Sequence, residues 1–131
     1  MSYLRFAGPS IDWQSHVEVG IFTAAYDLRD GGTLPDYEYE RLVALLDWFS
    51  EHLRRPARFA RSMRRPWGAI CWFRPTAREH LSRAHEMAAL LRDHDVLIRM
   101  IKTRRVGYVV YEDEHQVVAE PYADTLRRGA A

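Results

Sequence analysis

Residues 69–101, AICWFRPTAREHLSRAHEMAALLRDHDVLIRMI, hold the pattern that decides the fold. The run Ala69–Phe73 is apolar without alternation, which is typical of a strand covered on both faces, so we place it in the centre of a sheet. The capping-box pattern at 76–79 starts a helix whose apolar stripe continues to about Asp93. A further strand, residues 96–102, completes a unit with the length of a right-handed parallel crossover.

The segment before this unit predicts one strand and two helices. Residues 3–7 are expected to form a strand that ends at the turn formers Gly8-Pro9-Ser10. A capping box at 15–18 starts the first helix, and Gly31-Gly32 ends it. The second helix starts near Thr33-Leu34-Pro35-Asp36 and runs to about Leu53.

The segment after it predicts two more strands, residues 106–111 and 116–120, which join strand 96–102 in an antiparallel meander. The order β-α-α-β-α-β-β-β indicates an α+β two-layer sandwich: a mixed, mostly antiparallel sheet of about five strands with three helices on one face. We expect a single domain over 1–131, with an ordered core of about 2–123 and a frayed C-terminal tail at 124–131.

The composition indicates the cellular compartment in which we expect the protein. The chain has 131 residues, and its single cysteine, Cys71, lies in the apolar run and has no internal partner for a disulfide. No stretch has the length of a signal peptide's apolar region or of a membrane span. We therefore expect a reducing, cytoplasmic setting and no membrane contact.

Charge is segregated along the chain although the net charge is only +1. Residues 1–53 carry three arginines and nine acids, residues 54–111 carry fourteen bases and four acids, and the last twenty carry two bases and five acids. Eighteen of the nineteen bases are arginine, which favours planar, forked recognition of carboxylate or phosphate. Codon bias would produce the same excess of arginine.

The connection between the second helix and the central strand is the first candidate site. Guanidinium groups pair with phosphates or carboxylates, and aromatic rings stack on exposed bases. A connection that contains both arginines and aromatic residues therefore suits nucleic acid or an acidic protein surface. The turn after strand 96–102 could extend this patch. Alternatively, the arginines pair with acids of the preceding helix, Glu38, Glu40, Asp47 or Glu51. The candidate partner-binding residues are Arg54, Arg55, Arg58, Phe59, Arg61, Arg64, Arg65, Trp67, Arg104 and Arg105.

The hairpin turn Glu112-Asp113-Glu114-His115 is the second candidate, because three carboxylates and an imidazole could hold a divalent cation or provide a general base. It supports an alternative function, a small metal-dependent hydrolase or nuclease. These residue types also favour hairpin turns for ordinary backbone reasons.

Other catalytic signatures are absent from the sequence. No glycine-rich phosphate loop, nucleophile elbow, paired Cys-x-x-Cys or H-E-x-x-H occurs. His80 and His85 are five residues apart, so they cannot grip one metal ion from a helix face. Cys71 has no basic neighbour in sequence until Arg74, unlike an activated nucleophile. We assign no catalytic residue, metal ligand or cofactor.

Four tryptophans and seven tyrosines are many for a small core, and we expect Trp13, Tyr37 and Tyr39 to lie outside it. Together these features favour a small non-enzymatic binding module whose arginine-rich connection contacts an anionic macromolecule. Self-association of the acidic helical half with the basic connection is a third possibility, and it predicts a salt-sensitive homo-oligomer.

Overall fold

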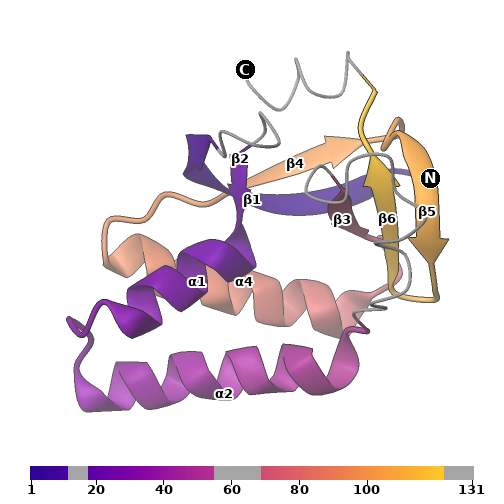
Figure 1. Cartoon of the computed structure of the whole chain (residues 1–131). Coiled ribbons are helices and arrows are strands. Elements are labelled where there is room, and N and C mark those ends of the chain that lie inside the picture. Colours follow the sequence, from indigo (N-terminus) through magenta and orange to yellow (C-terminus); the bar gives the residue numbers. More distant parts are fainter. Residues whose placement is uncertain (12–17, 55–68, 123–131) are drawn as a thin grey trace.

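The computed structural model describes residues 1–11, 18–54 and 69–122, and Figure 1 shows three helices packed on one face of a sheet. This agrees with the predicted α+β architecture. The strands are β1 (Tyr3–Ile11), β2 (Glu18–Gly20), β3 (Ile70–Phe73), β4 (Arg99–Thr103), β5 (Tyr108–Glu112) and β6 (Gln116–Glu120), and the helices are α1 (Ile21–Asp30), α2 (Asp36–His52) and α4 (Arg78–Asp93).

The strand β3 lies in the middle of the sheet, as its unbroken apolar sequence predicts. The strand order is β2-β1-β3-β6-β5, and β4 also pairs with β1. Every pairing between the described strands is antiparallel. Since β3 and β4 are both antiparallel to β1, they run in the same direction with β1 between them, and α4 connects them across that strand.

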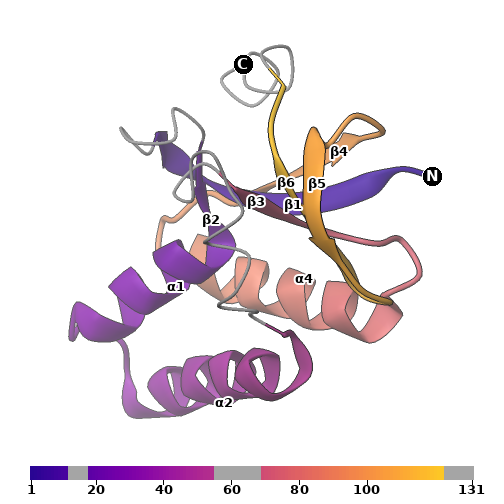
Figure 2. The same ribbon diagram turned by 45° about the vertical axis from the view of Figure 1, so that its right-hand side comes forward.

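The predicted meander of the last three strands is wrong in one respect. Strands β5 and β6 form a hairpin, but β4 pairs with β1 along Tyr3–Ala7 instead of with β5. The prediction relied on nearness in sequence, whereas β4 lies on the edge of β1 opposite β3. Figure 2 shows the resulting curled sheet, in which β5 and β6 cross over β1.

The start of the chain also differs from the prediction. Gly8-Pro9-Ser10 lies inside β1 and does not end it, and the pairing with β2 is irregular between Ala7 and Ile11. Proline is tolerated at such an irregularity because it has no amide to donate. A Cβ at Gly8 would lie 3.3 Å from the carbonyl oxygen of Val19, so this glycine permits close approach of two strands.

The helix start predicted near residues 33–36 is confirmed, because α2 begins at Asp36, but the capping boxes predicted at 15–18 and 76–79 are wrong. Residues 15–17 lie outside the described part of the chain, and Glu18 belongs to β2, so α1 begins at Ile21. The N-cap residues of α2 and α4 are Pro35 and Ala77, and neither side chain caps its helix. Gly31 and Gly32 do end α1, with Gly32 at a φ of 73°.

The predicted helix stripes form the main core between the helices and the sheet. In α2 every predicted stripe residue is buried, including Leu42 and Phe49, and in α4 Ala84, Ala88 and Leu91 are buried. A second, smaller cluster covers the opposite face of the sheet. It contains Ile70, Trp72, Val106, Val117 and Ala119. No helix in the described ranges is long and apolar enough to cross a membrane.

Candidate functional site

The two ends of the arginine-rich connection both lie on β6. At its beginning the side-chain amide of Gln116 donates a hydrogen bond to the carbonyl of Arg54, with a distance of 2.7 Å. At its end Ile70 pairs with Ala119. The Arg54 side chain is exposed. Seven of the predicted partner-binding residues lie outside the described residues: Arg55, Arg58, Phe59, Arg61, Arg64, Arg65 and Trp67.

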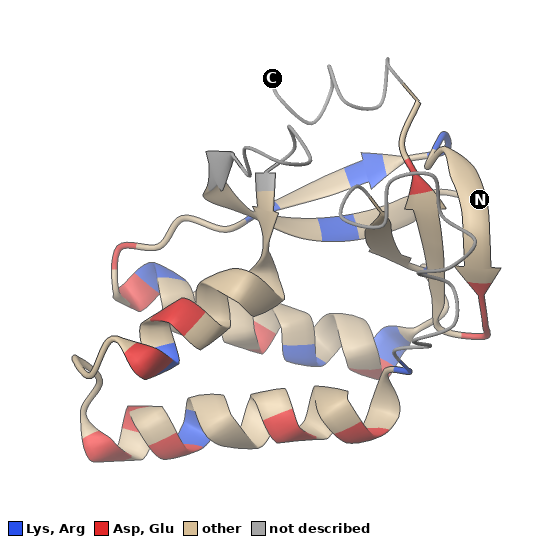
Figure 3. Ribbon diagram, in the orientation of Figure 1, with Lys and Arg blue, Asp and Glu red and all other residues tan. Residues whose placement is uncertain are grey.

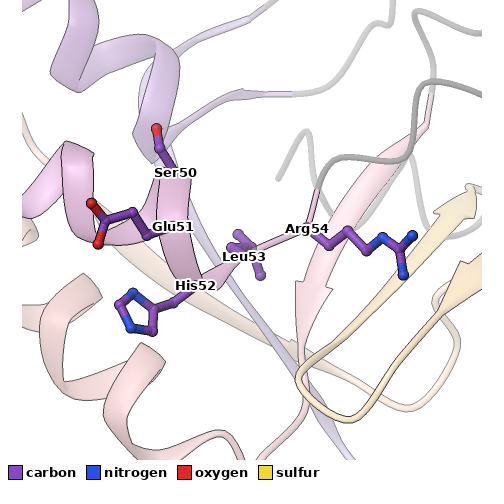
Figure 4. Close-up of a pocket in the computed structure, with 5 residues that line it drawn as sticks. All are labelled: Ser50, Glu51, His52, Leu53 and Arg54. Atoms are coloured by element: carbon purple, nitrogen blue, oxygen red, sulfur yellow. The ribbon is translucent and has the colours of Figure 1, made fainter.

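A pocket of about 560 Å³ opens where the connection leaves α2. Figure 4 shows the Arg54 side chain extending toward the β5–β6 hairpin, while Glu51 and His52 point to the other side of the chain. The lining is polar at both ends, with a buried leucine between. Among the described residues, the lining includes Ser50, Glu51, His52, Leu53 and Arg54.

Gln116 is the centre of a buried polar network that fixes this region. Its side chain is almost fully buried, and its Oε1 accepts a hydrogen bond from the Cys71 thiol at 3.0 Å. Its Nε2 also donates to Asp113 Oδ2 at 3.2 Å. A buried amide that donates and accepts in this way avoids a large desolvation cost. The network joins the end of α2, the strand β3 and the β5–β6 hairpin.

The acidic turn between β5 and β6 uses its carboxylates within the fold. Asp113 Oδ1 accepts the backbone amides of His115 and Gln116, and its Oδ2 accepts the Tyr111 hydroxyl at 2.8 Å. Burial raises the pKa of Asp113, but these hydrogen bonds outweigh it and hold the pKa below its usual value. Asp113 is therefore the residue that shapes the turn.

The other carboxylates of this turn have partners as well. Glu112 forms an ion pair with Arg74 at 3.0 Å, and Glu114 lies 3.4 Å from His115. Within the described ranges no three histidine, cysteine or acidic side chains are placed to hold a metal ion. The geometry assigns the turn a structural role.

A stack of aromatic and imidazole rings lies beside the network, and sequence reasoning missed it. His80 is buried, stacks on His115 with ring centres 4.3 Å apart, and donates to the His52 carbonyl at 2.8 Å. The His52 ring in turn stacks on Trp48, with ring centres 4.3 Å apart. Burial is the main cause that lowers the pKa of His80, and the neighbouring His115 lowers it further. The rings come from α2, α4 and the hairpin turn, so no local spacing reveals them.

The turn between β4 and β5 is rigid and basic. The Thr103 hydroxyl accepts the backbone amide of Arg105 at 3.1 Å, and Val106 is buried in the smaller cluster. Gly107 has a φ of 116°, and a Cβ there would lie 2.0 Å from the Glu120 carbonyl oxygen. The backbone is thus fixed, while the side chains of Arg104 and Arg105 are exposed.

The described arginines of the predicted patch do not form one cluster. Arg54 contacts Gln116 at the start of β6, whereas the Arg105 guanidinium lies over the ring of Tyr122, 5.1 Å from its centre, just beyond the end of β6. A strand of this length spans about 15 Å. Arg54 and the β4–β5 turn therefore lie at opposite ends of β6.

The remaining sequence candidates lie on the helical layer. Tyr37 and Tyr39 are exposed, as predicted, while Trp13 lies outside the described residues. Glu38, one of the acids considered as a partner for the arginines, forms a hydrogen-bonded ion pair with His94 instead. That contact lowers the pKa of Glu38 and joins α2 to the end of α4.

Compared with protein-family models, curated proteins and solved structures, the chain matches none of them.

Proposed function

We propose that this chain is a small non-enzymatic binding module that contacts an anionic macromolecule through the basic end of its sheet. The observation that supports this is the separation of charge between the helices and one part of the sheet, β4 with the turn after it. The three helices carry ten acidic and five basic residues, whereas β4 and the turn after it carry four basic residues and no acid. Figure 3 shows the two regions on different parts of the molecule.

The position of the acids determines how a partner approaches. Asp36, Glu40, Asp47 and Glu51 are exposed on α2 and would repel a polyanion. The β4 side presents Arg99, Lys102, Arg104 and Arg105, all exposed. A polyanion is therefore attracted to the sheet and turned away from the helices.

The rigidity of the β4–β5 turn also supports the proposal. Because Thr103, Val106 and Gly107 already fix the backbone, binding does not have to order the turn, which lowers the entropy cost of association. Lys102 and Arg104 have no ion pair with any residue that the structure describes. Their charges are available to a partner.

The arginine-rich connection belongs to the same proposal. Its ends lie along β6, beside the hairpin that bears the basic turn at its other end. The proposal includes Arg54, Arg55, Arg58, Phe59, Arg61, Arg64, Arg65 and Trp67 as contacts for the same anionic partner.

Fluorescence anisotropy tests the proposal with two labelled probes, an oligothymidylate and an oligoglutamate of about fifteen units each, at low and high salt. We expect micromolar binding of at least one probe at low salt. The R104A/R105A variant should bind about tenfold more weakly and show a salt dependence reduced by about two counterions.

The matched control is R78A/R92A, which removes two exposed arginines from α4. It should bind as the unmodified protein does. If neither probe binds at low salt, or if both double variants behave alike, the proposal is wrong. Light scattering at the same two salt concentrations detects the alternative, a homo-oligomer that dissociates as salt rises.

A further inference from the structure

We infer that the anionic partner is single-stranded nucleic acid and that Tyr108 is the platform on which one of its bases stacks. This inference rests on the proposed function and specifies the ligand of the same site. Tyr108 is the first residue of β5, directly after the basic turn, and its side chain is 63% exposed. An exposed aromatic ring beside cations is the arrangement that proteins use to bind single strands.

The Tyr108 ring has one aromatic neighbour among the described residues, Tyr122. It meets the Tyr122 ring at 74°, with centres 4.6 Å apart, and the Arg105 guanidinium lies over the Tyr122 ring. A T-shaped contact covers at most one face of a ring. The other face of Tyr108 can therefore receive a flat ligand.

The charges around Tyr108 distinguish it from the other exposed tyrosines. Tyr37 is equally exposed, but its hydroxyl donates to Glu38 at 3.1 Å and it lies on the acidic helix α2. The turn that precedes Tyr108 in the chain carries the exposed Arg104 and Arg105, and Glu120, the acid opposite Tyr108 in register, is buried. Among the exposed tyrosines in the part of the chain that the structure describes, Tyr37 and Tyr39 lie on the acidic helix α2, and Tyr108 alone follows a basic turn.

The exposed ring also favours a single strand over the other anionic partners. In a duplex the base faces are stacked on one another and are not accessible to a side chain. Aspartate and glutamate have no ring face, so an acidic protein would engage the cations and leave Tyr108 unused. A strand with unpaired bases uses both features, with phosphates on Lys102 and Arg104 and a base on Tyr108.

The experiment separates base stacking from phosphate binding. Anisotropy is measured with an oligothymidylate, with an abasic deoxyribose-phosphate oligomer of the same length, and with a duplex. We expect the oligothymidylate to bind at least tenfold more tightly than the abasic oligomer. Tyr108→Ala should remove most of that preference and leave binding of the abasic oligomer unchanged, whereas Tyr108→Phe should keep it.

Tyr37→Ala is the matched control, since it removes an equally exposed tyrosine from the acidic layer. It should keep the full preference for bases. Because the Tyr108 side chain is largely exposed, its variants should fold, and circular dichroism verifies this.

Two results would overturn the inference while the proposed function stands: equal binding of the abasic and base-bearing strands, or tighter binding of the duplex or oligoglutamate. Absence of binding to every probe would overturn both.

Discussion

The two turns at the ends of β5 use charged residues in opposite ways. In the turn after β5, the carboxylate of Asp113 accepts two backbone amides, a hydroxyl and a side-chain amide, so its charge stabilises the fold. In the turn before β5, glycine, threonine and valine fix the backbone, and the side chains of Arg104 and Arg105 are exposed.

The difference between the two turns helps to rank two charge clusters that are equally strong candidate sites in the sequence. A cluster whose side chains are hydrogen-bonded to their own backbone has a structural explanation. A cluster whose backbone is held by other residues leaves its side chains available for a partner. The basic turn is therefore the stronger candidate site, and substitutions in each turn test this distinction.

The largest effect is expected from Gly107→Ala, which attacks the support of the basic turn. The new Cβ would lie 2.0 Å from the Glu120 carbonyl oxygen at a φ of 116°, so the end of β6 must move. We expect the free energy of unfolding to fall by about 3 to 5 kcal/mol in urea titrations.

Gly32→Ala is the control for that experiment. Gly32 also has a positive φ, but a Cβ there has no neighbour within 4 Å. Only backbone strain remains, at a cost of about 1 kcal/mol. Equal losses in the two variants would show that the contact between Gly107 and β6 does not constrain the turn.

A smaller effect is expected from Asp113→Ala in the acidic turn, about 1 to 3 kcal/mol, since buried donors lose their acceptor. The pKa of Asp113 is lower in the folded protein than its usual 3.8, so its contribution is complete above that value and is lost as pH falls below it. Urea titrations across acidic pH should show this loss in the unmodified protein and not in the variant. Glu114→Ala, at a largely exposed side chain, should change little; an equal loss there would contradict the structural role of Asp113.

The smallest effect concerns His80, which packs against the same end of the hairpin. The titratable groups around it are His52 from α2, His115 from the turn and Glu79 on its own helix. Its pKa is lowered in the folded state, so unfolding takes up a proton below pH 6.5. Stability should be complete above that pH and fall below it, by no more than about 1.4 kcal/mol per pH unit.

His80→Gln should flatten this slope, because the amide keeps a donor for the His52 carbonyl and does not titrate. His85→Gln, on the same helix, controls for the loss of a histidine as such. The free energy of unfolding of both variants and of the unmodified protein, measured from pH 5 to 8, tests this expectation. If the free energy of unfolding depends on pH equally in His80→Gln and in the unmodified protein, His80 is not the cause of that dependence.

The sequence was sufficient for elements with a strong internal pattern. The period of α2 and α4 and the apolar run of β3 predicted the elements, and in α2 also the residues that are buried, whereas in α4 the buried His80, Met87 and Leu90 were not predicted. Where prediction failed, a tertiary contact replaced a local preference. Gly8 and Pro9 are turn formers, yet they serve a close strand crossing inside β1.

The candidate site shows the same division. The run Lys102-Thr103-Arg104-Arg105 is visible in sequence, and so is the acidic turn. The network of Gln116 with Cys71 and the stack of His80 on His115 join residues from separate elements. No spacing rule within one element could indicate them, because the pairing of β3 with β6 and the packing of α4 create them.

The strand β1 has partners on both of its edges, and this affects how the chain folds. Besides β2, the strand β1 pairs with two strands from distant parts of the sequence: Leu4 is opposite Phe73 on one edge and opposite Lys102 on the other. Closing loops of that length before the sheet can form slows folding to about milliseconds or longer. Until β4 has joined, one edge of β1 exposes unpaired amides and carbonyls, so pairing with β4 removes an edge on which another chain could aggregate.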